Sequence, residues 1–270
     1  MMKSIMRLDK TQVPSLIKFT TASATPKQWS KNIPVMAGYK NYDCMIVGGG
    51  GGASGTSSYQ YYYAHGSGGG GGGAVKFSGL LSDLAAITDY QVGLAGTHGA
   101  NTGNRVDGKN GGTGGTSLFA DKQAFGGKGG DGAAVDVQSG EIYSMGASIG
   151  GDGGTNNTPY GTGGFGMSGP DPGYNGTWET SGSLSGSRGG GGGGGKGNKT
   201  GSGAVTYWNA SRGGYGAYGG GDASSIYGDG TSKGGNGGGA DIEPILGESD
   251  RYGSYAAGSK STGVVIIKLS

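Results

Sequence analysis

Residues 126–131 read Gly126-Gly127-Lys128-Gly129-Gly130-Asp131, a repeat of two glycines and one residue with a side chain. The same period of three recurs in Gly150-Gly151-Asp152-Gly153-Gly154-Thr155, in Gly111-Gly112-Thr113-Gly114-Gly115-Thr116, and in Gly213-Gly214-Tyr215-Gly216-Ala217-Tyr218. Three residues per turn is the repeat of the polyproline-II helix, which has no internal hydrogen bonds. The period therefore predicts extended rods whose backbone groups must find partners in other segments of the chain.

Rods of this kind can pack closely, because two of their three faces have no Cβ atoms. Their backbones can then hydrogen-bond side to side, at about 0.5–1.5 kcal/mol net for each bond. Glycine blocks recur along the chain, at 48–52, 66–73, 111–115, 126–132, 150–154, 189–197, 213–221 and 234–239. We therefore expect a honeycomb of rods. Collagen would need an unbroken Gly-X-Y repeat rich in proline, whereas the chain has 7 prolines.

Strand-like segments bracket the glycine blocks. Gly263-Val264-Val265-Ile266-Ile267-Lys268-Leu269 is short, β-branched and almost continuously apolar, which predicts a strand buried on both faces. Tyr42 to Val47 is the first clear strand, and we expect it to pair with the terminal one. Ile17–Thr20 and Gln28–Ser30 are predicted to be shorter strands, and Pro34 is expected to precede a polar turn.

Two hairpins are predicted between these strands. One joins Ala74–Phe77 to Tyr90–Leu94 around residues 80–88, and the other joins Val135–Val137 to Glu141–Tyr143 around Ser139-Gly140. The fold class is therefore mostly β and irregular, with a small β-sandwich-like layer and a packed bundle of rods joined by loops. We interpret 1–16 as an N-terminal attachment segment and 17–270 as the glycine-rich domain.

The composition argues for an ordered chain. Although 71 of 270 residues are glycine, the chain has 16 tyrosines and a net charge of only +2, which disordered chains do not combine. The charge gives no reason to expect nucleic acid as a partner. The N-terminus lacks the apolar core of a signal peptide, and no stretch approaches the ~20 apolar residues of a membrane span. We expect a product released by lysis, with no membrane insertion.

Several motifs that resemble chemical sites lack their required context. Gly48–Gly55 follows a strand but has no Gly-Lys-Ser/Thr ending for a phosphate. Gly146-Ala147-Ser148-Ile149-Gly150 has the letters of a nucleophile elbow without the helix that must follow. His65 and His98 have no ligand-spaced partners for a metal, and Cys44 is predicted to be a buried, inert thiol. We therefore expect neither enzyme activity nor a cofactor nor a metal.

Aromatic and small polar residues cluster in the connectors between glycine blocks, as in Tyr59-Gln60-Tyr61-Tyr62-Tyr63. These residue types give antibody paratopes rigid contacts and adaptable hydrogen bonds. The alternative is that some rings cap the bundle, as we expect Trp29 to join the core. The predicted receptor-binding residues are Tyr59, Tyr61, Tyr62, Tyr63, Asn157, Tyr160, Tyr174, Trp178, Tyr207, Trp208, Tyr227, Tyr252 and Tyr255.

The order of these pieces resembles the glycine-rich domain of bacteriophage tail-fibre and receptor-binding proteins, the tip adhesins. The pieces are Val47 with Gly48–Gly52, Tyr90-Gln91-Val92-Gly93-Leu94-Ala95-Gly96, the segment Ser117–Ala120 with its continuation at 124–130, and the terminal 263–269. The resemblance covers about 17–270. It implies a packed bundle of polyglycine-II helices and attachment to a phage tail. The chain has no recognisable copy of that family's N-terminal attachment region.

The expected function is therefore that of a phage tail-fibre tip adhesin, located extracellularly on the virion. Its expected partners are a bacterial surface receptor, either an outer-membrane protein or a glycan, and other tail proteins. A trimer and a monomer on a trimeric fibre both remain open. The alternative is a structural tail or baseplate subunit that docks another virion protein. An ice-binding protein would show a regular Thr/Ala array, and the outward positions here mix Lys, Asp, Thr, Tyr and Asn.

Overall fold

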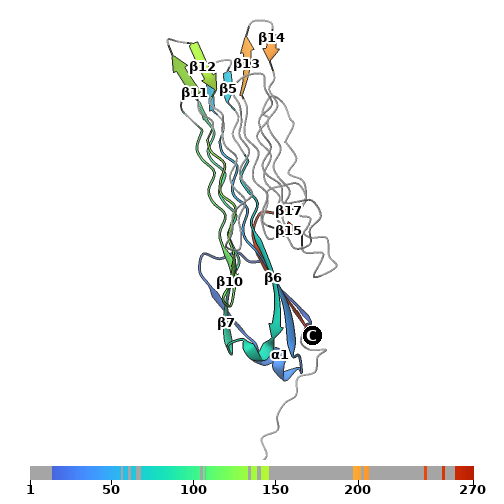
Figure 1. Cartoon of the computed structure of the whole chain (residues 1–270). Coiled ribbons are helices and arrows are strands. Elements are labelled where there is room, and N and C mark those ends of the chain that lie inside the picture. Colours follow the sequence, from blue (N-terminus) through green and yellow to red (C-terminus); the bar gives the residue numbers. More distant parts are fainter. Residues whose placement is uncertain are drawn as a thin grey trace, which may run out of the picture.

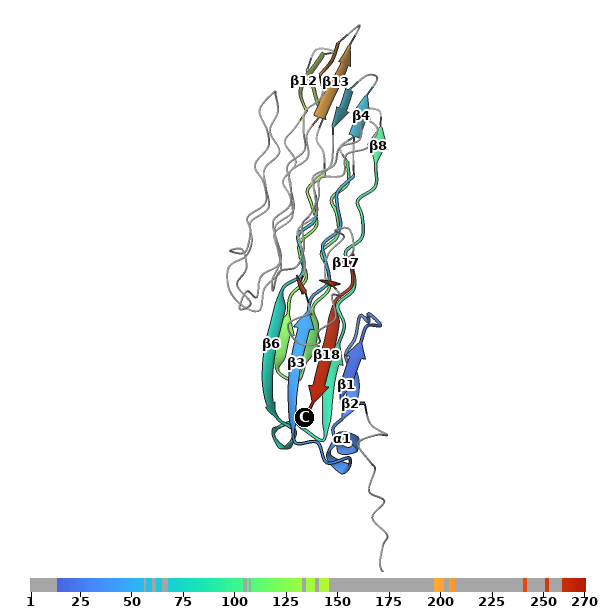
Figure 2. The same ribbon diagram turned by 90° about the vertical axis from the view of Figure 1, so that its right-hand side faces the viewer.

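The computed structural model describes only part of the chain. It covers residues 14–55, 57–59, 62–64, 68–103, 106, 108–132, 135–138, 141–145, 197–201, 204–206, 240–241, 251–252 and 259–270. The molecule is elongated, with two packed β-sheets at one end, which we call the base, and short strands at the other, which we call the tip (Figures 1 and 2). Extended glycine segments connect the two ends.

Two four-stranded antiparallel sheets form a sandwich at the base. The first has the order β1-β18-β3-β6, with β1 at Leu16–Phe19, β18 at Val264–Leu269, β3 at Asn41–Val47 and β6 at Ala74–Leu80. The second has the order β10-β9-β7-β2, with β10 at Lys122–Ala124, β9 at Ser117–Phe119, β7 at Ile87–Gln91 and β2 at Lys27–Ser30. The described part of the fold is therefore all-β apart from two short helical turns, α1 at Asn32–Met36 and a 3-10 turn at Leu81–Asp83.

The predicted pairing of the first clear strand with the terminal strand is confirmed. β18 pairs antiparallel with β3 from Val264↔Val47 to Leu269↔Tyr42. One face of this pair contributes Cys44, Ile46, Val265 and Ile267 to the core between the sheets. The other face contributes Met45, Val47, Val264 and Ile266 to a second buried cluster. The apolar run of β18 is thus buried on both faces, as predicted.

Aromatic rings join the two sheets across the core. Phe19 of β1 stacks on Tyr90 of β7 with ring centroids 3.9 Å apart. Trp29 of β2 is half-buried and lies 5.7 Å from Phe119 of β9, so the prediction that Trp29 joins the core is confirmed.

The predicted hairpin between 74 and 94 is wrong, because β6 and β7 belong to different sheets. Between them, Leu81–Asp83 form a 3-10 turn, and Leu81 and Leu84 are buried in the core. Because these two leucines are buried between the sheets, the connection from β6 to β7 crosses from the first sheet to the second at the end of the sandwich. The second predicted hairpin is confirmed, since β11 (Val135–Gln138) pairs antiparallel with β12 (Glu141–Met145).

The turn expected after Pro34 does not follow the proline directly, because the helical turn α1 continues to Met36. Pro34 lies in the single turn of α1, where its missing N–H costs least. The turn follows at Ala37 and Gly38, and the φ of 86° at Gly38 suits glycine.

Within the described residues, five extended glycine segments, which we call rods, run from the sandwich toward the tip. They are the central rod at 48–55, which continues β3, and its neighbours at 68–73, 92–101, 108–116 and 125–132. Backbone hydrogen bonds of 2.7–3.1 Å join them side to side. None of these segments is a β-strand, and Figure 1 shows them as wavy traces lying alongside one another.

The bonds of the central rod repeat every three residues. Gly48 and Gly51 donate to the rod 68–73, whereas Gly49, Gly52 and Gly55 donate to the rod 108–116. Gly50 donates to the carbonyl of Ser261, and the carbonyls at 50 and 53 accept from the rod 92–101. Consecutive residues of the central rod therefore hydrogen-bond to different neighbouring segments, in a pattern that repeats every three residues. In a β-strand the pattern repeats every two residues.

The neighbouring rods also bond to one another around the central rod. Gly70 donates to Lys128 and Gly73 to Phe125, which joins rods 68–73 and 125–132. Gly111 and Gly114 donate to the rod 125–132, and Gly112 and Gly115 donate to the rod 92–101. Gly263, which leads into β18, donates to Gly93. The central rod is consequently enclosed by protein backbone.

Ser117 fixes the junction where the sheets give way to rods. Its buried hydroxyl donates to the carbonyl of Val47 at 2.6 Å and accepts from the N–H of Gly93 at 2.8 Å. A Cβ at Gly263 would lie 2.3 Å from this hydroxyl. One small side chain therefore links the ends of β3 and β9 to the rods that start there.

Candidate functional site

The tip is the first candidate site, because it carries some of the predicted receptor-binding residues. A five-stranded sheet lies there in the order β14-β13-β5-β4-β8, with β14 at Ala204–Thr206, β13 at Gly197–Gly201, β5 at Tyr62–Ala64, β4 at Ser57–Tyr59 and β8 at Thr102–Gly103. Figure 2 shows β4, β8, β12 and β13 at the end remote from the sandwich. The rods therefore bring strands from distant parts of the chain to one end.

The strand register at the tip brings three predicted tyrosines together. Tyr59 of β4 is the cross-strand partner of Tyr62 of β5, and Tyr62 is also the partner of Lys199 of β13. Tyr63 is the partner of Ser58 and of Asn198. Direct cross-strand partners share a face of a sheet, so Tyr59 and Tyr62 occupy positions on one face and Tyr63 on the other.

Most of the other predicted receptor-binding residues lie outside the described residues. These are Tyr61, Asn157, Tyr160, Tyr174, Trp178, Tyr207, Trp208, Tyr227 and Tyr255. The sequence analysis missed Asn198 and Lys199 of β13, which are the cross-strand partners of Tyr63 and Tyr62 of β5. Only strand pairing across more than 130 residues shows that they are neighbours.

Tyr252 does not fit the predicted role, because its side chain is buried. It lies in β16 (Arg251–Tyr252), which pairs with β15 (Ala240–Asp241) and β17 (Ser259–Lys260). Its exposed fraction is 1%, and it belongs to the cluster of Met45, Val47 and Ile266 on the outer face of the first sheet. A buried ring offers no surface to a receptor, so we assign Tyr252 to the core.

The central rod uses its backbone N–H groups within the protein. Those of Gly48 to Gly52 and of Gly55 donate to carbonyls of other segments. A phosphate-binding loop needs such groups directed at the ligand, so the glycines after β3 do not form one. These glycines belong to the central rod that continues β3.

Two other residues that were weighed for chemistry have structural surroundings. Cys44 is fully buried, and burial raises the pKa of its thiol well above the usual value, which keeps the group protonated and inert. His98 accepts a hydrogen bond at Nδ1 from the N–H of Ala53, 3.2 Å away, and so ties its rod to the central one. His65 lies outside the described residues.

A second candidate site at the base was not predicted. A cavity of about 590 Å³ opens between β6, the Leu81–Asp83 turn and the β9–β10 turn, and Tyr42, Asp89 and Asp121 contribute to its lining. Nothing in the local sequence marks it, since its walls come from separate strands of both sheets. Within the part of the chain that the structure describes, no three His, Cys, Asp or Glu residues are placed to share a metal ion.

Comparison with known proteins gives one family. The family model described as a glycine-rich domain matches residues 24–270, which is nearly the whole sandwich and all the rods. None of the curated proteins matches the chain. Among the described residues, no helix is long and apolar enough to cross a membrane.

Proposed function

We propose that this chain, which belongs to the glycine-rich domain family, is a bacteriophage tail-fibre tip adhesin that binds a bacterial surface receptor through aromatic loops. The observation that carries the proposal is the gathering of Tyr59, Tyr62 and Tyr63 at the tip, far from the sandwich. Tyrosine supplies a large contact with only two rotatable side-chain bonds, so it loses little entropy on binding. The receptor is an outer-membrane protein or a surface glycan.

In this proposal the rods are polyglycine-II helices that form a rigid mount for the loops. The three-residue repeat of their hydrogen bonds supports that assignment, because it matches three residues per turn. We propose that the blocks at 150–154, 189–197, 213–221 and 234–239 extend the same bundle. Loops on a rigid scaffold can change sequence without disturbing it, which suits recognition of varied bacterial surfaces.

Amide hydrogen exchange tests the extent of the bundle. If 189–197 joins the lattice, its amides should exchange as slowly as those of 48–55, since both would be hydrogen-bonded to neighbouring rods. Exchange at the rate of an unstructured peptide across 189–197, with protection retained at 48–55, would show that the bundle stops short of this block.

Binding of labelled protein to a panel of bacterial strains tests the adhesin assignment. We expect saturable, strain-selective binding that the triple variant Tyr61→Ala/Tyr62→Ala/Tyr63→Ala loses. A matched control replaces exposed residues of the rods, Thr113→Ala and Lys128→Ala, which lie away from the tip and should leave binding unchanged.

If a folded sample binds no strain, the alternative becomes the better account. The chain would then be a structural tail or baseplate subunit, and its aromatic loops would dock another virion protein. Binding that survives the triple tyrosine variant would keep the adhesin but place its contact surface elsewhere.

A further inference from the structure

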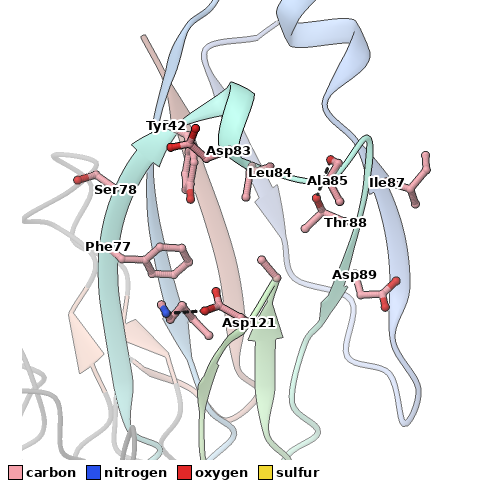
Figure 3. Close-up of a pocket in the computed structure, with 12 residues that line it drawn as sticks. Tyr42, Phe77, Ser78, Asp83, Leu84, Ala85, Ile87, Thr88, Asp89 and Asp121 are labelled. Carbon is pink, nitrogen blue, oxygen red and sulfur yellow. Dashed lines mark hydrogen bonds and ion pairs between the residues drawn. The ribbon is translucent and has the colours of Figure 1, made fainter.

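The cavity at the base lies between the two sheets at the opposite end from the tip. Figure 3 shows Phe77 of β6 and Tyr42 of β3 on one side, and Thr88 and Asp89 of β7 on the other. The turn between β9 and β10, with Asp121, closes the lower part of the view. Its volume of about 590 Å³ is large enough for a long side chain or a small organic molecule.

The hydroxyl of Tyr42 is buried at this cavity, and none of the described residues hydrogen-bonds to it. Tyr42 is 7% exposed, and its ring is held edge-on to the rings of Phe77 and Phe119 at centroid distances of 6.1 and 6.3 Å. No group in the described part of the chain hydrogen-bonds its hydroxyl, although buried hydroxyls are normally paired. Figure 3 shows the ring pointing from the strand into the space beside Leu84. A ligand that donates a hydrogen bond would satisfy this oxygen.

The rim of the cavity carries more negative than positive charge. Asp83, Asp89 and Asp121 line it, whereas its one ammonium group belongs to Lys122. Lys122 Nζ lies 2.6 Å from Asp121 Oδ2, so one of the three carboxylates is already engaged. Among the described residues, Asp83 accepts from the hydroxyl of Ser82, at 3.0 Å, and Figure 3 shows its side chain beside Tyr42. Asp89 lies on the exposed face of β7, opposite the buried Thr88, and points away from Tyr42.

The same charges act on the tyrosine. Burial raises the pKa of Tyr42, and Cys44, Asp121 and Asp83 raise it further. Because Cys44 is protonated, the negative field at the hydroxyl comes from Asp121 and Asp83, and it disfavours an anion and favours a cation at this place. The Tyr42 hydroxyl can accept a hydrogen bond as well as donate one, and the Asp83 carboxylate can only accept, whereas an ammonium or guanidinium group has donors only.

We propose that this cavity binds an organic cation, the ammonium or guanidinium group of a Lys or Arg side chain presented by a protein partner at the base. The cation would donate to Tyr42 Oη and to Asp83, which Figure 3 shows beside Tyr42, with its alkyl stem against the ring of Phe77. Aromatic walls with a carboxylate rim attract such groups both electrostatically and by contact.

The surface around the cavity suits a protein partner. Val35 of α1, Leu80 at the end of β6 and Ile87 at the start of β7 are each about half exposed, and these three elements end at the base. Apolar side chains around a charged pocket match the pattern of a buried anchor within an apolar contact. This inference does not depend on the proposed receptor binding, because it concerns the opposite end of the molecule.

Titration of the full chain with capped amino acids, followed by amide chemical shifts, tests the proposal. Nα-acetyl-lysine methylamide and Nα-acetyl-arginine methylamide should shift the amides around Tyr42, Asp83 and Asp121 with dissociation constants on the order of millimolar. Nα-acetyl-norleucine methylamide, which has the alkyl stem without the charge, should not. Equal shifts with norleucine, or no shifts with either cation, would overturn the proposal.

Variants identify the groups that hold the cation. Tyr42→Phe should weaken binding by roughly threefold to tenfold, the value of one hydrogen bond, and Asp83→Asn should weaken it similarly. Lys122→Gln should strengthen it, because a competing ammonium is removed. The control Asp43→Asn makes the same charge change on the opposite face of β3 and should leave binding unchanged. Equal weakening by Asp43→Asn would reduce the effect to net charge and overturn the site.

A further titration distinguishes a cation on a protein partner from a free small cation. A peptide of the form acetyl-Leu-Arg-Leu-amide should bind more tightly than capped arginine, because its flanking side chains can contact Val35, Leu80 and Ile87. Spermidine, a free polyamine without apolar flanks, should bind no better than capped lysine. Tighter binding of spermidine than of the peptide would overturn the assignment to a protein partner.

Discussion

At the scale of single residues, a rod has glycine at the positions where the backbone of a neighbouring rod approaches too closely for a Cβ atom. In the rod 92–101, a Cβ at Gly93, Gly96 or Gly99 would come within 2.1 Å of a carbonyl oxygen of the rod 108–116. The positions between them hold Leu94, Ala95, Thr97 and His98. In the enclosed central rod, one face has glycine at 49, 52 and 55, a second has Gly48 and Gly51 followed by Ser54, and Ala53 lies on the third.

Substitution at the centre should therefore cost far more than substitution at the surface. A Cβ at Gly52 would lie 1.9 Å from the carbonyl oxygen of Thr97, which is backbone and cannot rotate away. We expect Gly52→Ala to destabilise the fold by about 3 kcal/mol or more, and Thr113→Ala, at an exposed rod position, to change it by less than about 0.5 kcal/mol. Urea unfolding measures both. Similar costs for the two would mean that the rods are not tightly packed.

The buried thiol predicts a dependence of stability on pH. Burial raises the pKa of Cys44 in the folded state, so only the unfolded chain ionises near the usual value of about 8.5. The contribution of Cys44 is full below that pH and is lost as the pH rises toward the folded pKa, by up to about 1.4 kcal/mol per pH unit. We expect Cys44→Ala to remove this alkaline loss. Native protein should also fail to react with a thiol reagent at pH 8 until it is unfolded.

At the scale of elements, the β9–β10 turn stores backbone strain. Ala120 has a φ of 56°, a left-handed value that glycine adopts more readily. Phe119 and Lys122 are cross-strand partners, so Ala120 and Asp121 form a two-residue turn. The N–H of Ala120 donates to the carbonyl of Asp89, which holds the turn against β7.

Relief of this strain should stabilise the protein. We expect Ala120→Gly to raise the free energy of unfolding by about 0.5–1 kcal/mol, because the lost strain exceeds the extra entropy of glycine in the unfolded chain. Ala85→Gly, at a position without positive φ, is the control and should destabilise. Thermal and urea unfolding report both. A loss of stability in Ala120→Gly would show that the turn is unstrained.

Much of this element structure was predictable from sequence, and what failed did so for physical reasons. The β-branched run of 264–269 and the three-residue glycine period are local patterns, so the strand and the rods could be read directly. The crossover from β6 to β7 through Leu81 and Leu84 could not be predicted in this way, because a hairpin and a crossover have the same local sequence signals. The pairing of Tyr62 with Lys199 and the cavity at Tyr42 depend on contacts between distant segments, which no local pattern encodes.

At the scale of the whole molecule, closure depends on one strand that follows all the rods in the chain. β18 lies between β1 and β3 and contributes to the buried clusters on both sides of its sheet. Its N-terminal neighbour Gly263 also bonds to the rod 92–101. The sandwich and the rods therefore form one cooperative unit through this strand.

Removal of residues 262–270 should abolish folding. The loss exposes the apolar sides of β1 and β3 and leaves their ladder hydrogen bonds unpaired. We expect the truncated chain to lack amide dispersion in its NMR spectrum, including at the tip. A synthetic peptide of 262–270 added in excess should restore dispersion in part. A truncated chain whose rods and tip remain folded would show that the bundle is stable by itself.

The three-residue register of the rods acts as a reading frame written in amino acids. A single inserted residue would turn every later position by a third of a turn, so that side chains replace glycines at the contacts with neighbouring backbones. Three inserted residues add one full turn and restore the frame. Bundles of this design should therefore lengthen during evolution in steps of three residues in adjacent rods, or nine nucleotides in their genes. The loops that join the rods can change in length by any number of residues.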